Sequence, residues 1–316
     1  MNNQYTYDVT MFRDTFESRF TYLNGFLRNV SRFSTRPALN DPISGRRWTY
    51  AELNAEANRL AHALRANGVG KNDVVMFALL NSPEFVFCYL AAHKIGAIAC
   101  PVNYRQGAGE IALVIDDSRP KAFLYDAEFG DLSAGALGMC EHKPHVTIMV
   151  DYKGGAQAPD GHILYQDYVA NQPETDPPID FAPHIYDETT RLYTSGTTNR
   201  PKGVPINNVN EVLSAHDVMM HFPLGPTDRT MNMTPWFPRG GIHSGGPCPT
   251  LYAGGEVVIL RDFSPKRCLE YAEKYEVSFL IGVPTIIAML ARAQEKAHAK
   301  LSALRGIVTM GAPFEK

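Results

Sequence analysis

Residues 73–102 read DVVMFALLNSPEFVFCYLAAHKIGAIACPV, and this stretch decides the fold class. Its first segment, 73–80, is almost entirely apolar and is typical of a buried strand. Ser82-Pro83 is a typical helix start, because serine can cap free N–H groups and proline fits the first turn. The helical pattern continues to about Gly96, and another apolar strand follows. A strand, a helix and a second strand in this order predict a parallel βαβ unit.

The same alternation continues on both sides of this unit. Before it, Thr49 and Glu52 form a capping box that opens a helix with apolar residues at helical spacing as far as Gly68. Strands that alternate with helices predict an α/β fold with mainly parallel strands and flanking helices. The other expected elements are helices at about 109–117, 208–221 and 285–296, a helix that starts at Ser264, and strands at 121–125, 146–150, 230–234, 256–260, 278–283 and 306–310.

Composition limits the class of protein. With 316 residues, 45% of them hydrophobic, the chain can bury a large core, and its formal net charge of -3 offers no basic field to nucleic acid. The N-terminus lacks the basic patch and apolar run of a signal peptide, and no stretch reaches the roughly 18 apolar residues of a membrane span. The five scattered cysteines argue against a disulfide framework or a zinc site. We therefore expect a cytoplasmic protein with no transmembrane segment and no nucleic-acid partner.

A polar loop near the middle of the chain has the composition of a polyphosphate site. Residues 194–203 read TSGTTNRPKG. Glycines let backbone N–H groups approach an anion, hydroxyls add short donors, and lysine adds a mobile positive charge. The order differs from a Walker A loop, because proline precedes the lysine and glycine follows it, and an ordinary flexible surface loop is the alternative. The residues that we expect to contact phosphate are Thr194, Ser195, Gly196, Thr197, Thr198, Lys202 and Gly203.

The order of residues in this loop resembles the phosphate-binding signature of adenylate-forming enzymes, T-S-G-T-T-G-x-P-K-G. Acyl-CoA synthetases, luciferases and peptide-synthetase adenylation domains share this signature. Asn199 stands where the family usually has glycine, and asparagine tolerates the left-handed backbone conformation better than most residues. Segments at 36–39, 49–53, 68–73 and 96–103 also resemble acyl-CoA synthetases, in the same order. The resemblance covers nearly the whole chain and implies the use of ATP with Mg2+, a small carboxylic acid and coenzyme A.

Residues 234–246, TPWFPRGGIHSGG, suit a concave site for an organic acid, because they combine two aromatic residues, a histidine and four glycines. The resemblance places the acyl pocket here and beside residues 282–285. A structural role is the alternative for each: aromatic residues suit a core, a loop histidine is often structural, and Thr285 can cap a helix. Pro238 stands where many family members have histidine. The residues assigned to the acyl pocket are Trp236, Phe237, His243 and Val283.

A candidate adenine site follows the last apolar strand. Gly311, Ala312 and Pro313 resemble the family segment that lies against the adenine. Ligands gather at the carboxyl ends of parallel strands, which favours binding over a plain strand-ending turn.

The resemblance also predicts the domain organisation. Family members have two stacked, sheet-centred α/β subdomains in this region, so residues 1–316 are expected to form a partial N-terminal AMP-binding domain. One subdomain is expected at about 70–190 and the other at about 10–69 together with 204–316. The family continues into a small C-terminal lid domain with a catalytic lysine. Because the sequence stops before such a domain, the expectation is a truncated fold with unknown catalytic residues and, by itself, little or no activity.

The implied activity is that of an acyl- or aryl-CoA synthetase. Such an AMP-forming acid–thiol ligase activates a carboxylic acid as acyl-adenylate and then forms the CoA thioester. The substrate carboxylate is already an anion near neutral pH, so the protein must mainly offset the repulsion between two anions. Two alternatives stay open, a non-catalytic nucleotide- or acyl-binding module and an adenylation domain that loads a carrier protein.

Overall fold

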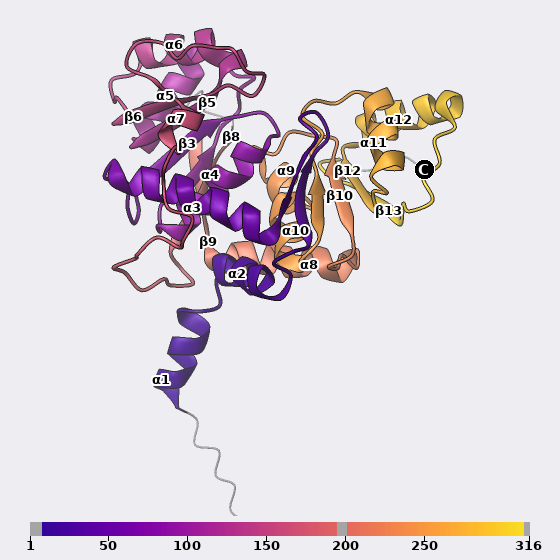
Figure 1. Ribbon diagram of the computed structural model, residues 1–316, viewed down its shortest axis with the longest axis horizontal. Coiled ribbons are helices and arrows are strands. Elements are labelled where there is room, and N and C mark those ends of the chain that lie inside the picture. The colour runs from indigo at the N-terminus through magenta and orange to yellow at the C-terminus, as the bar shows by residue number, and fades with distance from the viewer. Residues whose placement is uncertain (1–7, 195–200, 313–316) are drawn as a thin grey trace, which may run out of the picture.

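The computed structural model describes residues 8–194 and 201–312, and in these ranges the strands form two sheets flanked by helices (Figure 1). The fold class is α/β, as the sequence predicts. None of the helices in these two ranges is long and apolar enough to cross a membrane. All five cysteines are buried and free of disulfide bonds, in agreement with their scattered positions.

The segment 73–102 forms the predicted βαβ unit. Strand β3 (Val74–Ala78), helix α4 (Pro83–Lys94) and strand β4 (Ile98–Pro101) follow one another, and the two strands pair in parallel. The Ser82 side chain accepts a hydrogen bond from a backbone N–H of the first turn at 3.3 Å, which caps the helix. Almost every residue of α4 is buried, which explains why its sequence is apolar on all sides.

The larger sheet adds five strands to β3 and β4, namely β5 (Ala122–Asp126), β6 (Val146–Val150), β7 (Ile163–Leu164), β8 (Glu188–Thr194) and β9 (Lys202–Asn207). The seven strands lie in the order β7-β6-β5-β3-β4-β8-β9. All neighbours are parallel except β8 and β9, which form an antiparallel hairpin. Because β8 runs parallel to β4, the carboxyl ends of these two strands lie at the same edge of the sheet.

The smaller sheet consists of β1 (Pro37–Asp41), β2 (Arg46–Thr49), β10 (Arg229–Asn232), β11 (Glu256–Val258), β12 (Phe279–Gly282) and β13 (Gly306–Thr309). Their order is β13-β12-β10-β11-β1-β2, and only β1 and β2 pair in antiparallel fashion. Leu39 lies opposite Val257, so a strand from the start of the chain lies beside one from its last quarter. Both sheets are mainly parallel, while the proposed subdomain limits stay a prediction.

One apolar core joins the two sheets. Side chains of β3 alternate between two cores, with Val75 and Phe77 in the shared core and Val74 and Met76 on the outer face. The outer face of the larger sheet is covered by α5 (Ala108–Ser118) and α6 (Gly130–Met139). The outer face of the smaller sheet is covered by α11 (Pro265–Lys274) and α12 (Pro284–Ala297). The helices that contribute to the shared core are α2 (Tyr22–Arg32), α3 (Tyr50–Ala66), α4, α7 (Tyr165–Tyr168), α8 (Asn208–His221), α9 (Arg239–His243) and α10 (Pro247–Ala253).

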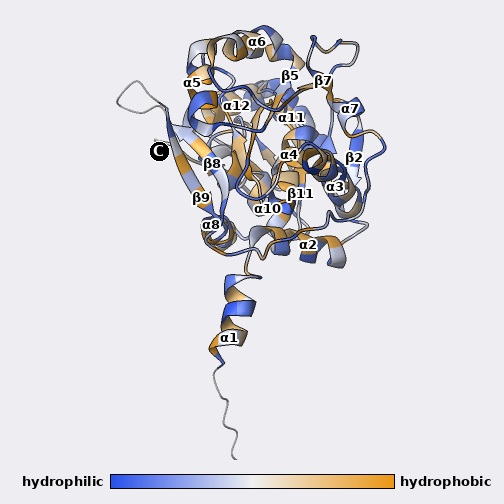
Figure 2. Cartoon of the chain, turned by 90° about the vertical axis from the view of Figure 1, so that its left-hand side faces the viewer, coloured by the Kyte–Doolittle hydropathy of each residue, from blue (hydrophilic) through white to orange (hydrophobic). Residues whose placement is uncertain are grey.

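Helix α1 (Val9–Phe12) lies apart from the rest of the molecule, and three other features differ from what the sequence patterns predict. At the N-terminal end, α1 projects from the rest of the molecule in both views (Figures 1 and 2). Helix α6 and the return strand β9 have no clear periodic pattern and were not predicted. The expected capping role of Thr285 is wrong, because α12 begins one residue earlier at Pro284 with Val283 as its N-cap. Proline takes that first position since it has no N–H to leave unpaired.

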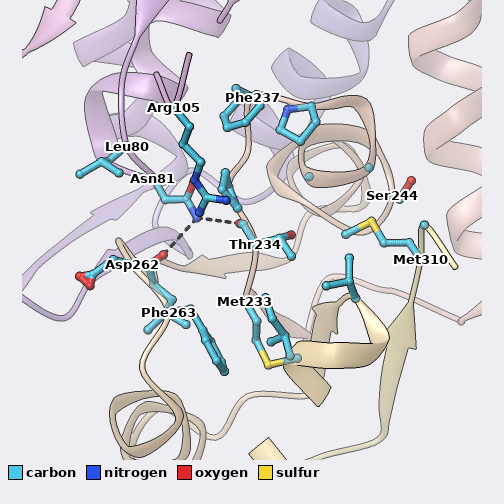
Figure 3. A pocket seen from close by; sticks show the side chains of 18 of the residues that line it. Leu80, Asn81, Arg105, Met233, Thr234, Phe237, Ser244, Asp262, Phe263 and Met310 are labelled. Carbon is cyan, nitrogen blue, oxygen red and sulfur yellow. Dashed lines mark hydrogen bonds between the residues drawn. The ribbon is translucent and has the colours of Figure 1, made fainter. Parts of the chain in front are cut away.

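Asn81 joins the two sheets where their strands end. It follows β3, and only 3% of its surface is exposed. Its side-chain amide donates hydrogen bonds to the carbonyl oxygens of Thr234 at 3.0 Å and Leu260 at 3.1 Å (Figure 3). Its Oδ1 accepts a hydrogen bond from the backbone N–H of Trp236 at 2.9 Å. The Asn81 side chain thereby supplies hydrogen-bond partners for three buried backbone groups in the loops of the smaller sheet.

Replacing Asn81 with alanine should lower the free energy of unfolding by about 3–5 kcal/mol, because two carbonyl groups and one N–H lose their partner in a buried place. Urea unfolding measures this loss. Asn24→Ala is the matched control, since the exposed Asn24 side chain donates only to the carbonyl of Arg19, and it should cost less than about 1 kcal/mol. Equal losses in the two variants would show that Asn81 does not hold the sheets together.

Candidate functional site

A pocket of about 600 Å3 opens where the strands of both sheets end (Figure 3). Each strand that reaches it contributes the residues just beyond its carboxyl end. In parallel α/β proteins this edge is where ligands bind. The pairs that follow strands are Leu80 and Asn81 after β3, Tyr104 and Arg105 after β4, Met233 and Thr234 after β10, and Leu260 and Arg261 after β11. Val283 after β12 and Met310 and Gly311 after β13 complete this set.

The wall of the pocket is mainly apolar and partly aromatic. Phe237 and Tyr104 pack edge to face with ring centroids 5.3 Å apart, and Tyr104 stacks on Phe129 at 4.7 Å. These contacts fix the aromatic rings in place before any ligand arrives. Phe237 comes from the loop before α9 (Arg239–His243) and forms a wall on the side of the smaller sheet. Tyr104 follows β4, so the opposite wall lies on the side of the larger sheet.

A tight turn brings α9 to the pocket, and Gly241 makes it feasible. A side-chain carbon on Gly241 would lie 1.9 Å from the carbonyl oxygen of Pro235, which is far inside van der Waals contact. The N–H of Gly241 donates to the carbonyl of Pro238 at 2.9 Å and closes the turn. Gly241 therefore serves a close backbone approach, as does Gly246, where a side-chain carbon would lie 1.9 Å from the carbonyl oxygen of Gly241.

The charged side chains that line the pocket are those of three arginines and of Asp262. Arg105 extends into it from the end of β4 (Figure 3), and Arg239 lies at its rim with Nη2 3.2 Å from the hydroxyl of Ser214. Arg261 is buried and donates to the carboxylates of Asp126 at 2.5 Å and Glu128 at 2.8 Å. Burial opposes its charge, but the two carboxylates more than offset this and raise the pKa of Arg261. Because these carboxylates compensate Arg261, the positive charge that can attract an anionic ligand comes from Arg105 and Arg239.

The structure brings together two of the four residues assigned to the acyl pocket and one residue of the predicted adenine segment. Phe237, Val283 and Gly311 all line the pocket. Ala312 is the exposed residue next to Gly311, and Pro313 lies outside the described residues. These positions place the predicted acyl and adenine segments side by side.

Two residues assigned to the acyl pocket do not line it. Trp236 is 1% exposed and packs its ring against Phe85 at 5.5 Å between centroids, so its side chain belongs to the shared core. His243 is buried as well, and its Nε2 lies 2.7 Å from Oε2 of Glu211. For both Trp236 and His243, the observed contacts agree with a structural role in the interior of the protein and not with a place in the pocket wall.

The phosphate loop is described only at its two ends. Thr194 ends β8, Lys202 begins β9, and the two residues pair across the hairpin, with Gly203 opposite Tyr193. Both Thr194 and Lys202 are exposed. Because β8 is parallel to β4, this end of the hairpin lies at the same sheet edge as the pocket. The predicted loop residues Ser195, Gly196, Thr197, Thr198 and Asn199 lie outside the described residues.

Several pocket residues were absent from the sequence-based prediction. Asn81, Tyr104, Arg105 and Arg261 come directly after strands that the periodicity does predict. The rule that ligands gather at carboxyl ends of parallel strands could have nominated them.

Comparison with known proteins assigns the family. Residues 26–316 match the family described as AMP-binding enzyme, and the chain belongs to this family. The chain is 32% identical over 267 residues to a 3-hydroxybenzoate–CoA/4-hydroxybenzoate–CoA ligase of Thauera aromatica, covering 83% of this chain and 49% of that protein. It is 30% identical over 274 residues to a feruloyl-CoA synthase of an Amycolatopsis species, covering 85% of this chain and 50% of that protein. The chain thus spans about half the length of these curated relatives.

Solved structures share the fold. The crystal structure of an anthranilate CoA ligase in complex with anthranoyl-AMP superposes with a TM-score of 0.84 at 24% sequence identity, covering 92% of this chain and 55% of that one. The similarity shows that the two-sheet arrangement seen here is that of a known fold.

Trp236→Ala and Phe237→Ala should differ sharply in stability although the residues are neighbours. Loss of the fully buried indole should lower the free energy of unfolding by about 3–5 kcal/mol, whereas Phe237 is half-buried at a cavity and should cost roughly 1–2 kcal/mol. Urea unfolding of both variants tests this. A larger loss for Phe237→Ala would place that ring, and not Trp236, in the core.

Proposed function

We propose that this chain is the ATP- and acid-binding portion of an acyl- or aryl-CoA synthetase, an AMP-forming acid–thiol ligase. The observation that carries the proposal is the shared edge: the pocket lies at the carboxyl ends of strands from both sheets, and the hairpin that ends at Thr194 and Lys202 reaches that edge beside β4. An acid in the pocket and a triphosphate at the hairpin would therefore meet. Membership of the AMP-binding family supports the choice of nucleotide.

The proposed reaction has two steps. A carboxylate oxygen of the acid attacks the α-phosphorus of ATP; an oxygen–phosphorus bond forms, the bond to the bridging oxygen breaks, and pyrophosphate leaves. The thiol sulfur of coenzyme A then attacks the carbonyl carbon of the acyl-adenylate, AMP leaves, and the thiol proton passes to solvent. Since the acid is already ionised, the first step needs compensation of negative charge more than a general base.

The residues proposed for ATP act through charge and hydrogen bonds. Lys202 and the hydroxyl of Thr194 would bind phosphate oxygens from the two ends of the hairpin. Bound Mg2+ would add positive charge to the triphosphate and to the departing pyrophosphate. The further residues that we assign to the nucleotide are Ser195, Gly196, Thr197, Thr198 and Gly203 for phosphate and Gly311, Ala312 and Pro313 for adenine.

An aromatic acid is the substrate class that the pocket favours. The fixed rings of Phe237 and Tyr104 offer an edge and a face to an aromatic ligand, and Met233, Phe263 and Val283 continue the apolar wall. Two relatives are named as a hydroxybenzoate–CoA ligase and a feruloyl-CoA synthase, which supports this choice.

The decisive experiment is calorimetry with an aroyl-sulfamoyladenosine, a stable analogue of an aroyl-adenylate. The chain should bind this analogue more tightly than ATP, because the analogue occupies the pocket and the nucleotide site together. ATP–pyrophosphate exchange with a panel of aromatic acids then tests turnover. A folded chain that binds neither ATP nor the analogue would overturn the proposed function.

Lys202→Ala should weaken ATP binding about tenfold or more, because a charge-assisted contact with phosphate is lost. Calorimetric titration with ATP measures the change. Lys266→Ala is the control, because Lys266 is an exposed lysine of α11 on the outer face of the smaller sheet. The same affinity in both variants would exclude Lys202 from the phosphate site.

A further inference from the structure

Glu211 occupies an unusual place for a carboxylate. It lies in the first turn of α8, which starts immediately after the return strand β9 of the hairpin, and its side chain is completely buried. Few acidic residues are fully buried without partners that compensate the loss of water. The contacts of Glu211 therefore need an explanation beyond packing.

Four side chains donate hydrogen bonds to this carboxylate. Oε1 accepts from the hydroxyl of Thr190 at 2.7 Å and from that of Thr189 at 3.2 Å, both on β8, and the Thr189 hydroxyl is shared with the carbonyl oxygen of Ile206 at 3.2 Å. Oε2 accepts from the hydroxyl of Tyr89 at 2.6 Å and from Nε2 of His243 at 2.7 Å. A carboxylate has about four lone-pair positions, so its accepting capacity is used completely.

His243 contributes most to keeping Glu211 in its ionised form. Burial by itself raises the pKa of Glu211, but the nearby imidazole of His243 and its hydrogen bond, helped by His93 and Tyr89, outweigh burial and bring this pKa to about 2. Burial lowers the pKa of the neighbouring His93 to about 4, so that this second imidazole stays neutral near pH 7. The carboxylate form of Glu211 is therefore stabilised mainly through its contact with His243.

The same atoms do not suit a metal ion. Glu211, His243 and Cys248 place three ligand atoms within 4.8 Å of one another, and all three residues are buried. However, the carboxylate oxygen and the imidazole nitrogen are in direct contact at 2.7 Å. Ligand atoms around a tetrahedral zinc ion lie roughly 3.3 Å apart, given bonds of about 2.0 Å. The geometry favours a direct hydrogen bond between Glu211 and His243.

Three of the four hydrogen-bond partners of Glu211 belong to the two halves of the site, while Tyr89 lies on α4. Thr189 and Thr190 lie on β8, the strand that leads to Thr194, and the backbone of Glu211 continues from β9. His243 is the last residue of α9, whose first three residues line the acid pocket together with the following Ser244. One carboxylate thus contacts both the hairpin of the phosphate loop and the helix of the pocket.

We propose that Glu211 is a positioning residue that couples the β8–β9 hairpin to helix α9, so that nucleotide bound at the hairpin orders the wall of the acid pocket. The inference rests on the proposed function, because it takes ATP as the ligand of the hairpin. Replacing a buried charged group together with its partners by apolar residues often leaves stability unchanged or improved, so stability alone does not account for this buried carboxylate. Coupling two binding segments does account for it.

Hydrogen exchange with and without the non-hydrolysable analogue α,β-methylene-ATP tests the coupling. In the unmodified chain, saturation with this nucleotide should slow amide exchange in residues 235–246 at least about fivefold. In Glu211→Gln the nucleotide should still bind, as measured by calorimetry, while exchange in 235–246 no longer responds to it. A uniform rise in exchange that keeps the nucleotide response would reveal a purely structural role and overturn the proposal.

A second test variant and a matched control complete the experiment. Thr190→Val keeps the shape of the side chain and removes one hydrogen bond to Oε1, so it should reduce the response in 235–246 even if Glu211→Gln does not fold. Glu84→Gln is the matched control, because Glu84 also has a buried carboxylate oxygen but lies on α4, outside the Glu211 contacts, and it should keep the full response. Equal responses in Thr190→Val and Glu84→Gln would contradict the coupling.

The remaining outcomes are equally decisive. One equivalent of zinc in the purified chain, found by elemental analysis, would overturn the interpretation of Glu211 and His243 as a hydrogen-bonded pair. Failure of the unmodified chain to bind α,β-methylene-ATP at all would instead contradict the proposed function. Binding without any change in residues 235–246 would leave the proposed function intact and reject the coupling.

Discussion

The pocket depends on the buried side-chain amide of Asn81, which ties the end of β3 to the loops that follow β10 and β11. Each sheet supplies only part of the pocket wall, so the shape of the cavity depends on how the two sheets are held together at this edge. The buried ion pair between Arg261 and Asp126 adds a second tie between the sheets, from the loop after β11 to the end of β5. A binding site built between two sheets is pre-organised only as far as such contacts are rigid.

Elements set by local physics could be predicted from the sequence. The βαβ unit of 73–102 combines apolar runs with a Ser-Pro helix start, and the helix after Thr49 has a capping box that the structure contains in full. Strand β6 lies at the predicted residues, because an isolated apolar run between polar residues leaves little choice. Helix α6 was missed since its three glycines hide the helical pattern, and only packing on the sheet stabilises it.

The site was harder to predict because neighbouring residues of similar chemistry face different surroundings. Trp236 and Phe237 are both aromatic, yet the turn that Gly241 allows directs one ring to the core and the other to the pocket. His243 finds its partner 32 positions earlier in the chain, at Glu211. Such pairings follow from the tertiary fold, and no local pattern encodes them. The phosphate loop stays a prediction, and it could be made because the relevant residue types are concentrated in ten consecutive positions.

Helix α4 makes the two sheets a single cooperative unit. It is buried on nearly all sides, and its apolar side chains belong to the core that also contains strands of both sheets. A chain cut between the sheets would leave this helix with a bare apolar face, whichever half kept it. We therefore expect that a fragment containing only one of the sheets could not be expressed, exchanged or evolved separately. Recombination between relatives should be tolerated best where α4 stays together with the strands of both sheets.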